Sequence, residues 1–370
     1  MSRVPPTLRV AVAGAGGIAS GSHLPALAAA GDRVEVVAVA DVDRSRADTV
    51  ADSWNIPGRY DHVEQMLATE QVDLLVVCTP PVAHREAVIA GLDAGAWVWC
   101  EKPPVLSLAE YDEIAAHERA GGPYASYVFQ HRFGSAARQL RRQVAGGELG
   151  RPLVAVCHTL WYRGHEYYDV PWRGRWATEG GGPSMGHGIH QMDLLLDLLG
   201  DWAEVTALTG TLDRDVETED VSLAMVRFES GAVGSVVNSV LSPRETSYLR
   251  FDLTDATVEV EHLYGYDNAS WRWTPAPHVD DQARVAVWPP TDDVASSHRA
   301  QLTELIDSID RGERPRASGH DGRRVLELIA GIYRSAATGR AVRRADLQPG
   351  TPFYDRMDDV GAPTREGGAR

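Results

Sequence analysis

The first 130 residues of the chain alternate between short apolar runs, rich in β-branched residues, and stretches with helical periodicity. The apolar runs occupy residues 8–13, 34–40, 74–78, 97–100 and 124–129, and the helical stretches occupy residues 24–30, 44–52, 63–68, 84–94 and 108–119. Such alternation predicts βαβ units and a parallel sheet. Because the runs are apolar at nearly every position, we expect helices on both faces of that sheet. The sequence therefore predicts an N-terminal doubly wound α/β domain.

A second domain of different character is expected after residue 125. Glycine and proline interrupt the chain at residues 146–152, and strand-like runs then dominate up to residue 273. Short turns such as residues 229–232 indicate antiparallel hairpins. A helix is expected at residues 189–199, ended by Gly200, and helical periodicity returns beyond residue 293. We predict a Rossmann-type domain at 1–125, an α/β domain with an open, mainly antiparallel mixed sheet at 126–345, and a loosely held tail at 346–370.

The charge and the cysteines limit the partners and the compartment. The chain has 36 Lys and Arg against 52 Asp and Glu, a formal net charge of −16. Such a chain has no general attraction for nucleic acid or an anionic membrane, although a locally basic pocket stays compatible with it. No secretory leader or membrane-length apolar run is apparent, and Cys78, Cys100 and Cys157 are widely spaced. We expect a cytoplasmic protein with neither nucleic acid nor membrane as partner.

A glycine-rich turn follows the first predicted strand and precedes a helix. Its residues are Gly14, Ala15, Gly16, Gly17, Ile18 and Ala19. Gly14 permits a tight turn, and Gly16 lets backbone amides approach a pyrophosphate at the helix N-terminus. Asp41 ends the second predicted strand, where a carboxylate accepts hydrogen bonds from the ribose hydroxyls and repels a 2′-phosphate. This pattern predicts a dinucleotide site for NAD. A plain turn and a surface aspartate are the alternatives, and the nearby Arg44 and Arg46 leave NADP open.

Two further segments follow predicted strands directly. Thr79 and Pro80 come after the third apolar run, and Glu101 and Lys102 come after the fourth. Ligands of doubly wound sheets bind beyond the carboxyl ends of the strands, so both segments should border the cofactor. The Lys102 ammonium is placed to reach a substrate hydroxyl or the nicotinamide ribose. A surface ion pair of this lysine is the alternative.

The segment from residue 179 to 193 has the least usual composition, because glycines and a proline precede a predicted helix. His187 and His190 lie near the helix N-terminus, where the helix dipole disfavours a charged imidazole. A neutral imidazole suits the general base of an alcohol oxidation. Capping or packing is the alternative for each histidine. Metal ligation with Asp193 is disfavoured because that residue drifts off the shared helix face, and we expect no metal.

Aromatic residues gather just before this segment. They are Trp161, Tyr162, Tyr167, Tyr168, Trp172 and Trp176. Several fall in the polar stretch 163–179, which has no pattern of a buried strand. Exposed aromatic faces suit the C–H faces of a sugar or polyol. Core packing or a subunit interface is the alternative for each of them.

Together these motifs resemble the Gfo/Idh/MocA family of NAD(P)-dependent oxidoreductases, which includes glucose–fructose oxidoreductase and inositol dehydrogenase. The resemblance runs from Leu8 to Val342. The motifs that carry it are the glycine-rich turn, Thr79 and Pro80 followed by His84, Glu101-Lys102-Pro103, Trp172-Arg173, the segment 180–193, and the stretch 323–342 with Ser335, Ala336 and Gly339.

The resemblance implies hydride transfer between a nicotinamide and a secondary hydroxyl of a sugar, cyclitol or related compound. It also implies a homodimer or homotetramer formed through the open sheet. Lys102 matches the family's catalytic lysine, and His190 matches the histidine that acts as acid/base or substrate ligand, with His187 as its neighbour. The expected cofactor-binding residues are Gly14, Gly16, Gly17, Ile18, Ala19, Asp41, Thr79, Pro80, His84, Glu101, Lys102, Trp172 and Arg173. The expected substrate-binding residues are Lys102, Trp161, Tyr162, His187 and His190.

One residue departs from the family pattern. Many family dehydrogenases carry an aspartate four residues before the histidine, as part of the proton relay, and this chain has Gly186 there. The relay would then run through His190 with Lys102, through His187, or through water. Two other functions stay open on this ground: redox-neutral glycoside cleavage with a retained NAD, and non-catalytic binding of a dinucleotide or sugar by a regulator.

Overall fold

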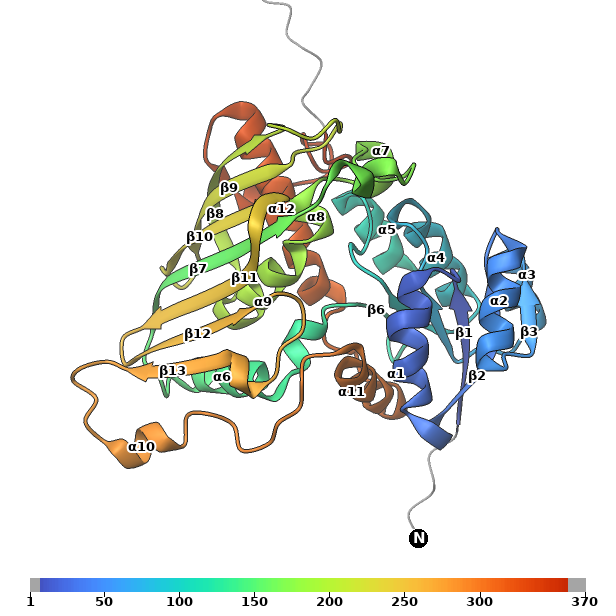
Figure 1. Cartoon of the computed structure of the whole chain (residues 1–370), viewed down its shortest axis with the longest axis horizontal. Coiled ribbons are helices and arrows are strands. Elements are labelled where there is room, and N and C mark those ends of the chain that lie inside the picture. The colour runs from blue at the N-terminus through green and yellow to red at the C-terminus, as the bar shows by residue number, and fades with distance from the viewer. Residues whose placement is uncertain (1–6, 359–370) are drawn as a thin grey trace, which may run out of the picture.

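The computed structural model describes residues 7–358, which form two sheets with helices between and around them (Figure 1). The first sheet has six parallel strands in the order β3-β2-β1-β4-β5-β6. Its strands are β1 (Leu8–Ala13), β2 (Val34–Ala40), β3 (Gly58–Tyr60), β4 (Leu74–Val77), β5 (Trp97–Cys100) and β6 (Ala125–Tyr127), and its helices are α1 (Leu24–Ala28), α2 (Arg44–Trp54), α3 (Val63–Thr69), α4 (His84–Asp93) and α5 (Leu108–His117). The predicted doubly wound domain is confirmed.

Strand β3 was not predicted, because it has three half-buried residues and no apolar run. The strand order reverses between β1 and β4, which are neighbours in the sheet. Ligands of this kind of fold bind at such a reversal, beyond the carboxyl ends of the strands. The sheet therefore places the glycine-rich turn after β1 and the segments after β4 and β5 around one cleft.

The second sheet has eight strands in the order β13-β12-β11-β7-β10-β9-β8-β14. The pair β10–β7 is parallel and the other pairs are antiparallel, so the predicted mixed sheet is confirmed. Its strands are β7 (Pro152–Tyr162), β8 (Trp202–Gly210), β9 (Val221–Phe228), β10 (Val233–Ser239), β11 (Leu241–Leu253), β12 (Ala256–His262), β13 (Trp271–Pro275) and β14 (Val342–Arg343). The accompanying helices are α6 (Ser135–Gly146), α7 (Trp176–Glu179), α8 (Pro183–Gly186), α9 (Ile189–Leu199), α10 (Gln282–Ala286), α11 (His298–Arg311) and α12 (Gly319–Thr338).

Short turns of other helical types connect these elements. A π-helical turn, Ala19–His23, precedes α1, and the 3-10 turns are Gly31–Arg33, Pro81–Ala83, Gln130–Phe133, His165–Asp169, Asn268–Ser270 and Arg344–Asp346. None of the helices in residues 7–358 combines the length and the apolar character needed to cross a membrane.

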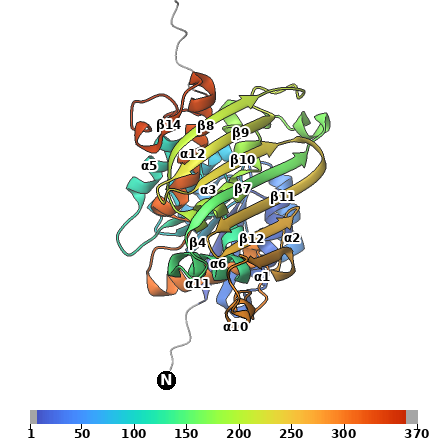
Figure 2. The same cartoon turned by 90° about the vertical axis from the view of Figure 1, so that its left-hand side faces the viewer.

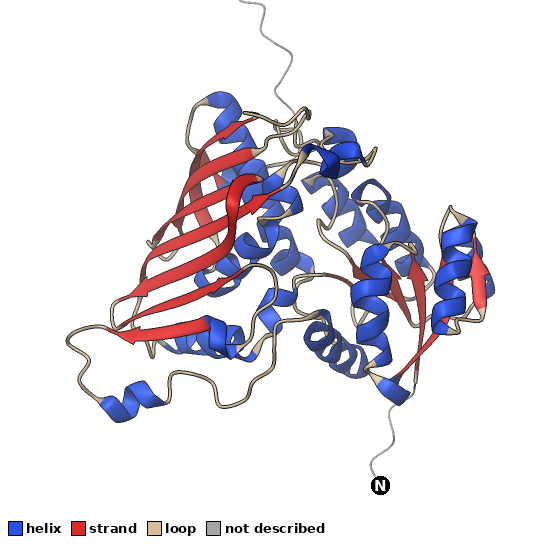
Figure 3. Cartoon of the chain, viewed as in Figure 1, coloured by secondary structure: helices blue, strands red, loops and turns tan. Residues whose placement is uncertain are grey.

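One face of the large sheet packs on helices and the other is open. Helices α8, α9 and α12, labelled in Figure 1, lie between this sheet and the N-terminal domain; Figure 3 shows the same view with all helices in blue. Helix α9 is buried along nearly its whole length, because it packs between the sheet and the rest of the core. The opposite face of the sheet is turned outward, and no helix of residues 7–358 covers it (Figure 2).

Helix α11 packs on the N-terminal domain, although it lies far along the chain. Leu302, Leu305 and Ile306 join a buried cluster with Leu24 of α1 and the strands of the first sheet. The Arg33 guanidinium also forms an ion pair with Asp310 at 2.8 Å. Residues of the predicted second domain therefore complete the core of the first.

Residues 346–358 pack against the rest of the protein, whereas the sequence predicted a loosely held tail there. Phe353, Tyr354 and Met357 are buried, and the Leu108 amide donates a hydrogen bond to the Tyr354 carbonyl at 3.1 Å. The aromatic and methionine side chains supply the apolar surface that seats this segment against α5. The remainder of the expected tail, 359–370, lies outside the described residues.

Candidate active site

A cavity of about 680 Å³ lies beyond the carboxyl ends of the parallel strands and is closed on its other side by residues of the second domain. Its size falls within the range of about 300–1,000 Å³ that is typical of small-molecule sites. Many of the predicted site residues border it: Gly14, Gly16, Gly17, Ile18, Asp41, Thr79, Pro80, Glu101, Lys102, Trp172 and Arg173. Tertiary structure thus brings together residues from four loops of the first domain and one segment of the second.

The glycine-rich turn has the geometry that a pyrophosphate requires. Gly14 has φ +95°, and a Cβ there would lie 2.7 Å from the backbone carbon of Cys78, so no other residue fits without strain. At Gly16 and Gly17 a Cβ would meet no heavy atom within 4 Å. Their backbones are therefore open to the cavity, while Ala19 is fully buried beneath the turn. The turn fits the diphosphate of a dinucleotide.

The Asp41 carboxylate is fixed at the end of β2. One oxygen accepts the Ala15 amide at 2.8 Å, and the other accepts the Asp43 amide at 2.9 Å. The side chain also borders the cavity, as the ribose-binding role requires. Arg46 borders the same end of the cavity and pairs with Asp43 at 3.2 Å. Arg44 does not border the cavity, and it pairs with Asp48 at 3.0 Å and with Asp61 at 3.4 Å.

His84 joins two loops behind the cavity wall. Its Nδ1 lies 2.8 Å from the Pro103 carbonyl oxygen, and its Nε2 lies 2.9 Å from the Thr79 carbonyl oxygen. The ring is buried and does not border the cavity, and burial lowers its pKa. Its contacts therefore position the loops that follow β4 and β5.

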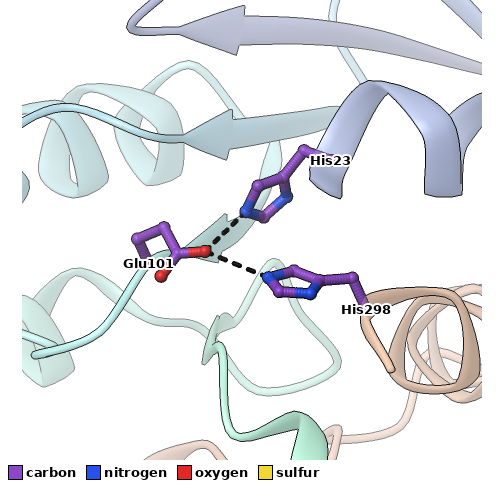
Figure 4. Close-up of side chains that lie close together, drawn as sticks. All are labelled: His23, Glu101 and His298. Carbon is purple, nitrogen blue, oxygen red and sulfur yellow. Dashed lines mark hydrogen bonds and ion pairs between the residues drawn. The ribbon is translucent and has the colours of Figure 1, made fainter. Parts of the chain in front are cut away.

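Glu101 is held by two histidines from distant parts of the chain (Figure 4). Its Oε1 lies 2.8 Å from His23 Nε2 and 3.2 Å from His298 Nε2, and its Oε2 accepts the Lys102 amide at 3.2 Å. Burial opposes ionisation of this carboxyl, but the hydrogen bonds from the histidines outweigh it and hold its pKa well below the usual value. Glu101 thus ties α11 and the turn before α1 to the backbone that carries Lys102.

Lys102 extends from β5 across the cleft. Its ammonium nitrogen donates a hydrogen bond to the Gly186 carbonyl oxygen at 2.8 Å. Burial lowers its pKa, although the charges of Glu101 and Glu179 oppose that shift. An ammonium has two further N–H groups for a ligand once one is occupied.

The two predicted catalytic histidines are buried behind this lysine, and neither borders the cavity. His187 Nε2 accepts the Arg163 guanidinium at 3.2 Å and lies 3.4 Å from the Tyr167 hydroxyl. His190 is 3 % exposed, and neither of its ring nitrogens has a hydrogen-bond partner among residues 7–358. Burial and the charge of Lys102 hold the pKa of both histidines well below the usual value, so both are neutral at pH 7.

Asp193 and the glycines of this segment have structural partners. The Asp193 carboxylate accepts the buried Arg132 guanidinium at 2.5 Å, which accounts for its place on α9. A side chain at Gly182 would clash with the Glu219 carbonyl, and one at Gly188 would clash with Asn238. These two glycines are therefore explained by close packing against neighbouring strands and loops.

The predicted aromatic residues divide between the cavity and its surroundings. Trp172 borders the cavity, whereas Trp161 is buried and donates its indole N–H to Ser247 at 2.9 Å. Tyr162 is 46 % exposed and lies outside the cavity lining. The Arg173 guanidinium lies 3.6 Å from the Tyr167 ring centroid, and two of its buried nitrogens have no hydrogen-bond partner in the described part of the chain.

Three residues that border the cavity were not among the predicted site residues: Tyr167, Glu179 and Tyr264. Tyr167 was noted only as one of several aromatic residues, and Tyr264 lies in a loop after β12 without a motif. Glu179 directly precedes the glycines of the 180–193 segment, but nothing in the sequence shows that its side chain reaches the neighbourhood of Lys102.

Comparison with known proteins matches both halves of the chain. Residues 8–127 match a family model described as the oxidoreductase family, NAD-binding Rossmann fold, and residues 137–259 match the GFO/IDH/MocA C-terminal domain. The chain is 28 % identical to D-glucoside 3-dehydrogenase of Escherichia coli, over 90 % of this chain and 97 % of that protein. It is 29 % identical to D-xylose 1-dehydrogenase (NADP(+)) 2 of Haloferax volcanii, over 90 % and 98 %.

A solved structure gives the same result. The WlbA dehydrogenase of Bordetella pertussis, in complex with NADH and UDP-GlcNAcA, superposes with a TM-score of 0.79 at 27 % identity, covering 91 % of this chain and 98 % of that one. The family predicted from the motifs is therefore confirmed. The chain belongs to the Gfo/Idh/MocA family of oxidoreductases, with an N-terminal NAD-binding Rossmann domain.

Proposed function

We propose that the protein transfers a hydride between NAD and a secondary hydroxyl of a sugar, cyclitol or sugar-derived substrate. The observation that carries this proposal is the position of the Lys102 ammonium, on the wall of the same cavity that contains the glycine-rich turn. The similar proteins are named as dehydrogenases of a glucoside and of xylose, and the WlbA structure contains NADH with a nucleotide sugar. A sugar-like substrate is consistent with all three.

The residues of this chain have separable roles in the proposal. A nicotinamide bound in the cavity supplies the carbon that accepts the hydride. Lys102 donates a hydrogen bond to the reacting oxygen and stabilises the negative charge that develops there. His190 lies behind the cavity wall, and neither of its ring nitrogens has a hydrogen-bond partner among residues 7–358, so we propose that it binds the same hydroxyl once the substrate reaches past Lys102. His187 is held by Arg163 and Tyr167 and sets the position of the neighbouring backbone.

The preference for NAD over NADP is part of the proposal and is supported by Asp41. Its carboxylate is fixed by two backbone amides at the end of β2 and borders the cavity. A 2′-phosphate beside this carboxylate would meet a like charge. Arg46 borders the same region, but its ion pair with Asp43 partly neutralises its charge.

The proposed activity is tested with a panel of sugars, polyols and nucleotide sugars, by following the absorbance of NADH. We expect turnover with at least one of them and a higher kcat/KM with NAD than with NADP. Turnover should fall by about 10²–10³-fold in Lys102→Met and be kept in Arg244→Met, which removes a cation from an exposed strand position. NAD that co-purifies and substrate cleavage without net NADH would contradict simple dehydrogenation and indicate the redox-neutral reaction.

We also propose that the protein is a homodimer or homotetramer formed through the outer face of the large sheet. Leu208 of β8 is 71 % exposed and Met225 of β9 is 68 % exposed, and Leu223 and Val154 add to the same face. Apolar side chains gathered on an uncovered sheet are typical of a protein interface. A second copy of this chain is the proposed partner.

The proposed compartment is the cytoplasm. Cys78, Cys100 and Cys157 are all free and buried in the structure. Thiols without a disulfide partner suit a reducing compartment.

A further inference from the structure

Glu179 is a buried acidic residue that borders the cavity, 6 % exposed, and no motif of the family assigned it a role. It is the last residue of α7, which ends because Gly180 adopts φ +78°. One carboxylate oxygen, Oε2, accepts the Gly174 amide at 2.6 Å. This bond fixes the side chain and leaves its second oxygen, Oε1, for another partner.

That second oxygen lies at the position of the missing aspartate. A Cβ built on Gly186 would be 3.4 Å from Glu179 Oε1, and among residues 7–358 no other heavy atom lies within 4 Å of it apart from the chain neighbours and the backbone of its own helix. An ordinary van der Waals contact therefore separates the Glu179 carboxylate from the site where the family's aspartate side chain would begin. The carbonyl of the same Gly186 accepts the Lys102 ammonium. The carboxylate thus reaches, from a neighbouring helix, the space beside the lysine that the glycine leaves open.

The surroundings of Glu179 allow it to hold and to release a proton near neutral pH. Burial raises its pKa to about 7, the Gly174 amide and the charges of Arg173 and Lys102 oppose that rise, and Glu219 adds to it. The pKa of Tyr168 is raised to about 12 by burial and by the charge of Glu179, so its hydroxyl stays neutral. A general base is most effective when its pKa lies near the working pH.

We propose that Glu179 is the proton acceptor of this site, in place of the aspartate that Gly186 lacks. The proposal rests on the proposed function. During oxidation the hydroxyl O–H bond breaks and its proton passes to the Glu179 carboxylate. The C–H bond of the same carbon breaks, its electron pair and hydrogen leave as hydride to NAD⁺, and the C–O bond becomes a carbonyl. The products are the ketone, NADH and protonated Glu179, and reduction reverses each change.

The buried histidines are poorer candidates for this role. Protonation of His187 or His190 would place a second positive charge beside Lys102 in a buried site, and their pKa values are well below the usual range for that reason together with burial. A carboxylate that accepts a proton becomes neutral, which a buried site favours. His190 therefore binds the hydroxyl, and Glu179 accepts the proton that the hydroxyl loses.

Glu179→Gln is the informative variant, because a glutamine carbonyl oxygen can still accept the Gly174 amide but the side chain cannot hold a proton. We expect kcat for oxidation to fall by about 10²–10⁴-fold, the usual contribution of a general base. The wild-type profile of log kcat/KM should rise with pH up to about 7, and the variant should lose this inflection. Binding of NADH, followed by its fluorescence, and the thermal unfolding midpoint should be unchanged.

Restoring a carboxylate at the family position gives a second test. In the Glu179→Gln background, Gly186→Asp should recover a substantial part of kcat together with a pH inflection, because its Cβ would lie 3.4 Å from the position of Glu179 Oε1. Gly186→Ala in the same background is the matched control, since it adds the Cβ without a carboxylate, and it should recover neither.

A readout without substrate separates this proposal from the proposed function. Infrared difference spectra of the whole protein between pH 6 and pH 8 should contain the C=O band of a protonated carboxyl that disappears in Glu179→Gln. Asp193 has its pKa raised to about 7 by burial as well, so the two proteins are compared to isolate the Glu179 band. Loss of the band without turnover of any panel compound would refute only the assigned substrate class. A band unaffected by the substitution, or a Glu179→Gln enzyme with the wild-type pH profile, would overturn the role of Glu179.

Discussion

The ammonium nitrogen of Lys102 lies 2.8 Å from the carbonyl oxygen of Gly186 and donates a hydrogen bond to it across the cleft between the two domains. Lys102 follows β5 of the parallel sheet, and Gly186 ends α8 of the second domain. The bond fixes a flexible side chain before a ligand arrives. Binding then costs less side-chain entropy, because the Lys102 side chain on the cavity wall is already held in place.

Replacing this lysine should remove catalysis and leave the cofactor site intact. Lys102→Met keeps most of the apolar stem but lacks the positive charge that stabilises the developing oxyanion. We expect kcat/KM to fall by about 10²–10³-fold, whereas the affinity for NADH changes little because the glycine-rich turn is unaltered. Steady-state kinetics and fluorescence titration measure the two quantities. Activity within a few fold of wild type would show that the lysine does not contact the reacting oxygen.

The Asp41 carboxylate should determine which dinucleotide is used. In Asp41→Ser the negative charge is gone and space opens beside Arg46. The ratio of kcat/KM for NAD over NADP should therefore fall by roughly 10–100-fold, which corresponds to the loss of about 1.5–3 kcal/mol of hydrogen bonding to a charged group. Asp52→Ser on the exposed side of α2 serves as control and should leave the ratio unchanged. An unaltered ratio in Asp41→Ser would mean that another group selects the cofactor.

The oligomeric state should depend on the outer face of the large sheet. Leu208 lies directly opposite Leu223 on the adjacent strand, and Met225 lies on the same face. The double variant Leu208→Glu with Met225→Glu places two charges in the proposed interface, which are costly to bury. We expect the mass in solution, measured by light scattering after size exclusion, to fall to that of one chain. Val287→Glu, at an exposed site on the end of α10, should keep the wild-type mass.

Acidification should destabilise the protein through its buried histidines. For His262, burial lowers the folded-state pKa from 6.5 to about 4, so its unfolded form binds the proton first. The associated stability is fully present above pH 6.5 and is lost as the pH falls toward 4, by up to about 1.4 kcal/mol per pH unit for each such group. The histidines with lowered pKa include His23, His84, His131, His187, His190 and His262.

Buried carboxyls act in the opposite direction. The pKa of Glu179 and that of Asp193 are raised to about 7 by burial, so their protonation stabilises the folded state as the pH falls below 7. The histidines outnumber them, and the urea midpoint should therefore decrease from pH 7 to pH 5. His262→Asn should show a shallower decrease than wild type. A midpoint that is constant over this interval would show that the histidines titrate normally.

The strands and helices of the first domain could be predicted nearly residue by residue, because their signals are local. Apolar runs at 8–13, 34–40 and 97–100 coincide with β1, β2 and β5. Burial on both faces of a parallel strand leaves an uninterrupted apolar run in the sequence. Strand β3 has no such run, since its residues are only half buried at the sheet edge, and it could not be found this way.

The packing of α11 on the first domain and the seating of residues 346–358 could not be predicted either. Both depend on contacts between segments that are hundreds of residues apart, such as Arg33 with Asp310 and Leu108 with Tyr354. Periodicity shows which face of an element is apolar, but it does not show which other element covers that face.

The candidate site divides in the same way. The dinucleotide half could be predicted from local signals, because the strand, Gly14, Gly16 and the following helix are contiguous and their residue types are those that a pyrophosphate-binding turn needs. The sequence also placed Lys102 at the end of a strand and showed that Gly186 lacks a carboxylate. The contact between Glu179 and that glycine could not be predicted from the sequence, because it arises where the end of α7 folds back beside α8. Through-space neighbours of this kind are set by packing, which no spacing along the chain records.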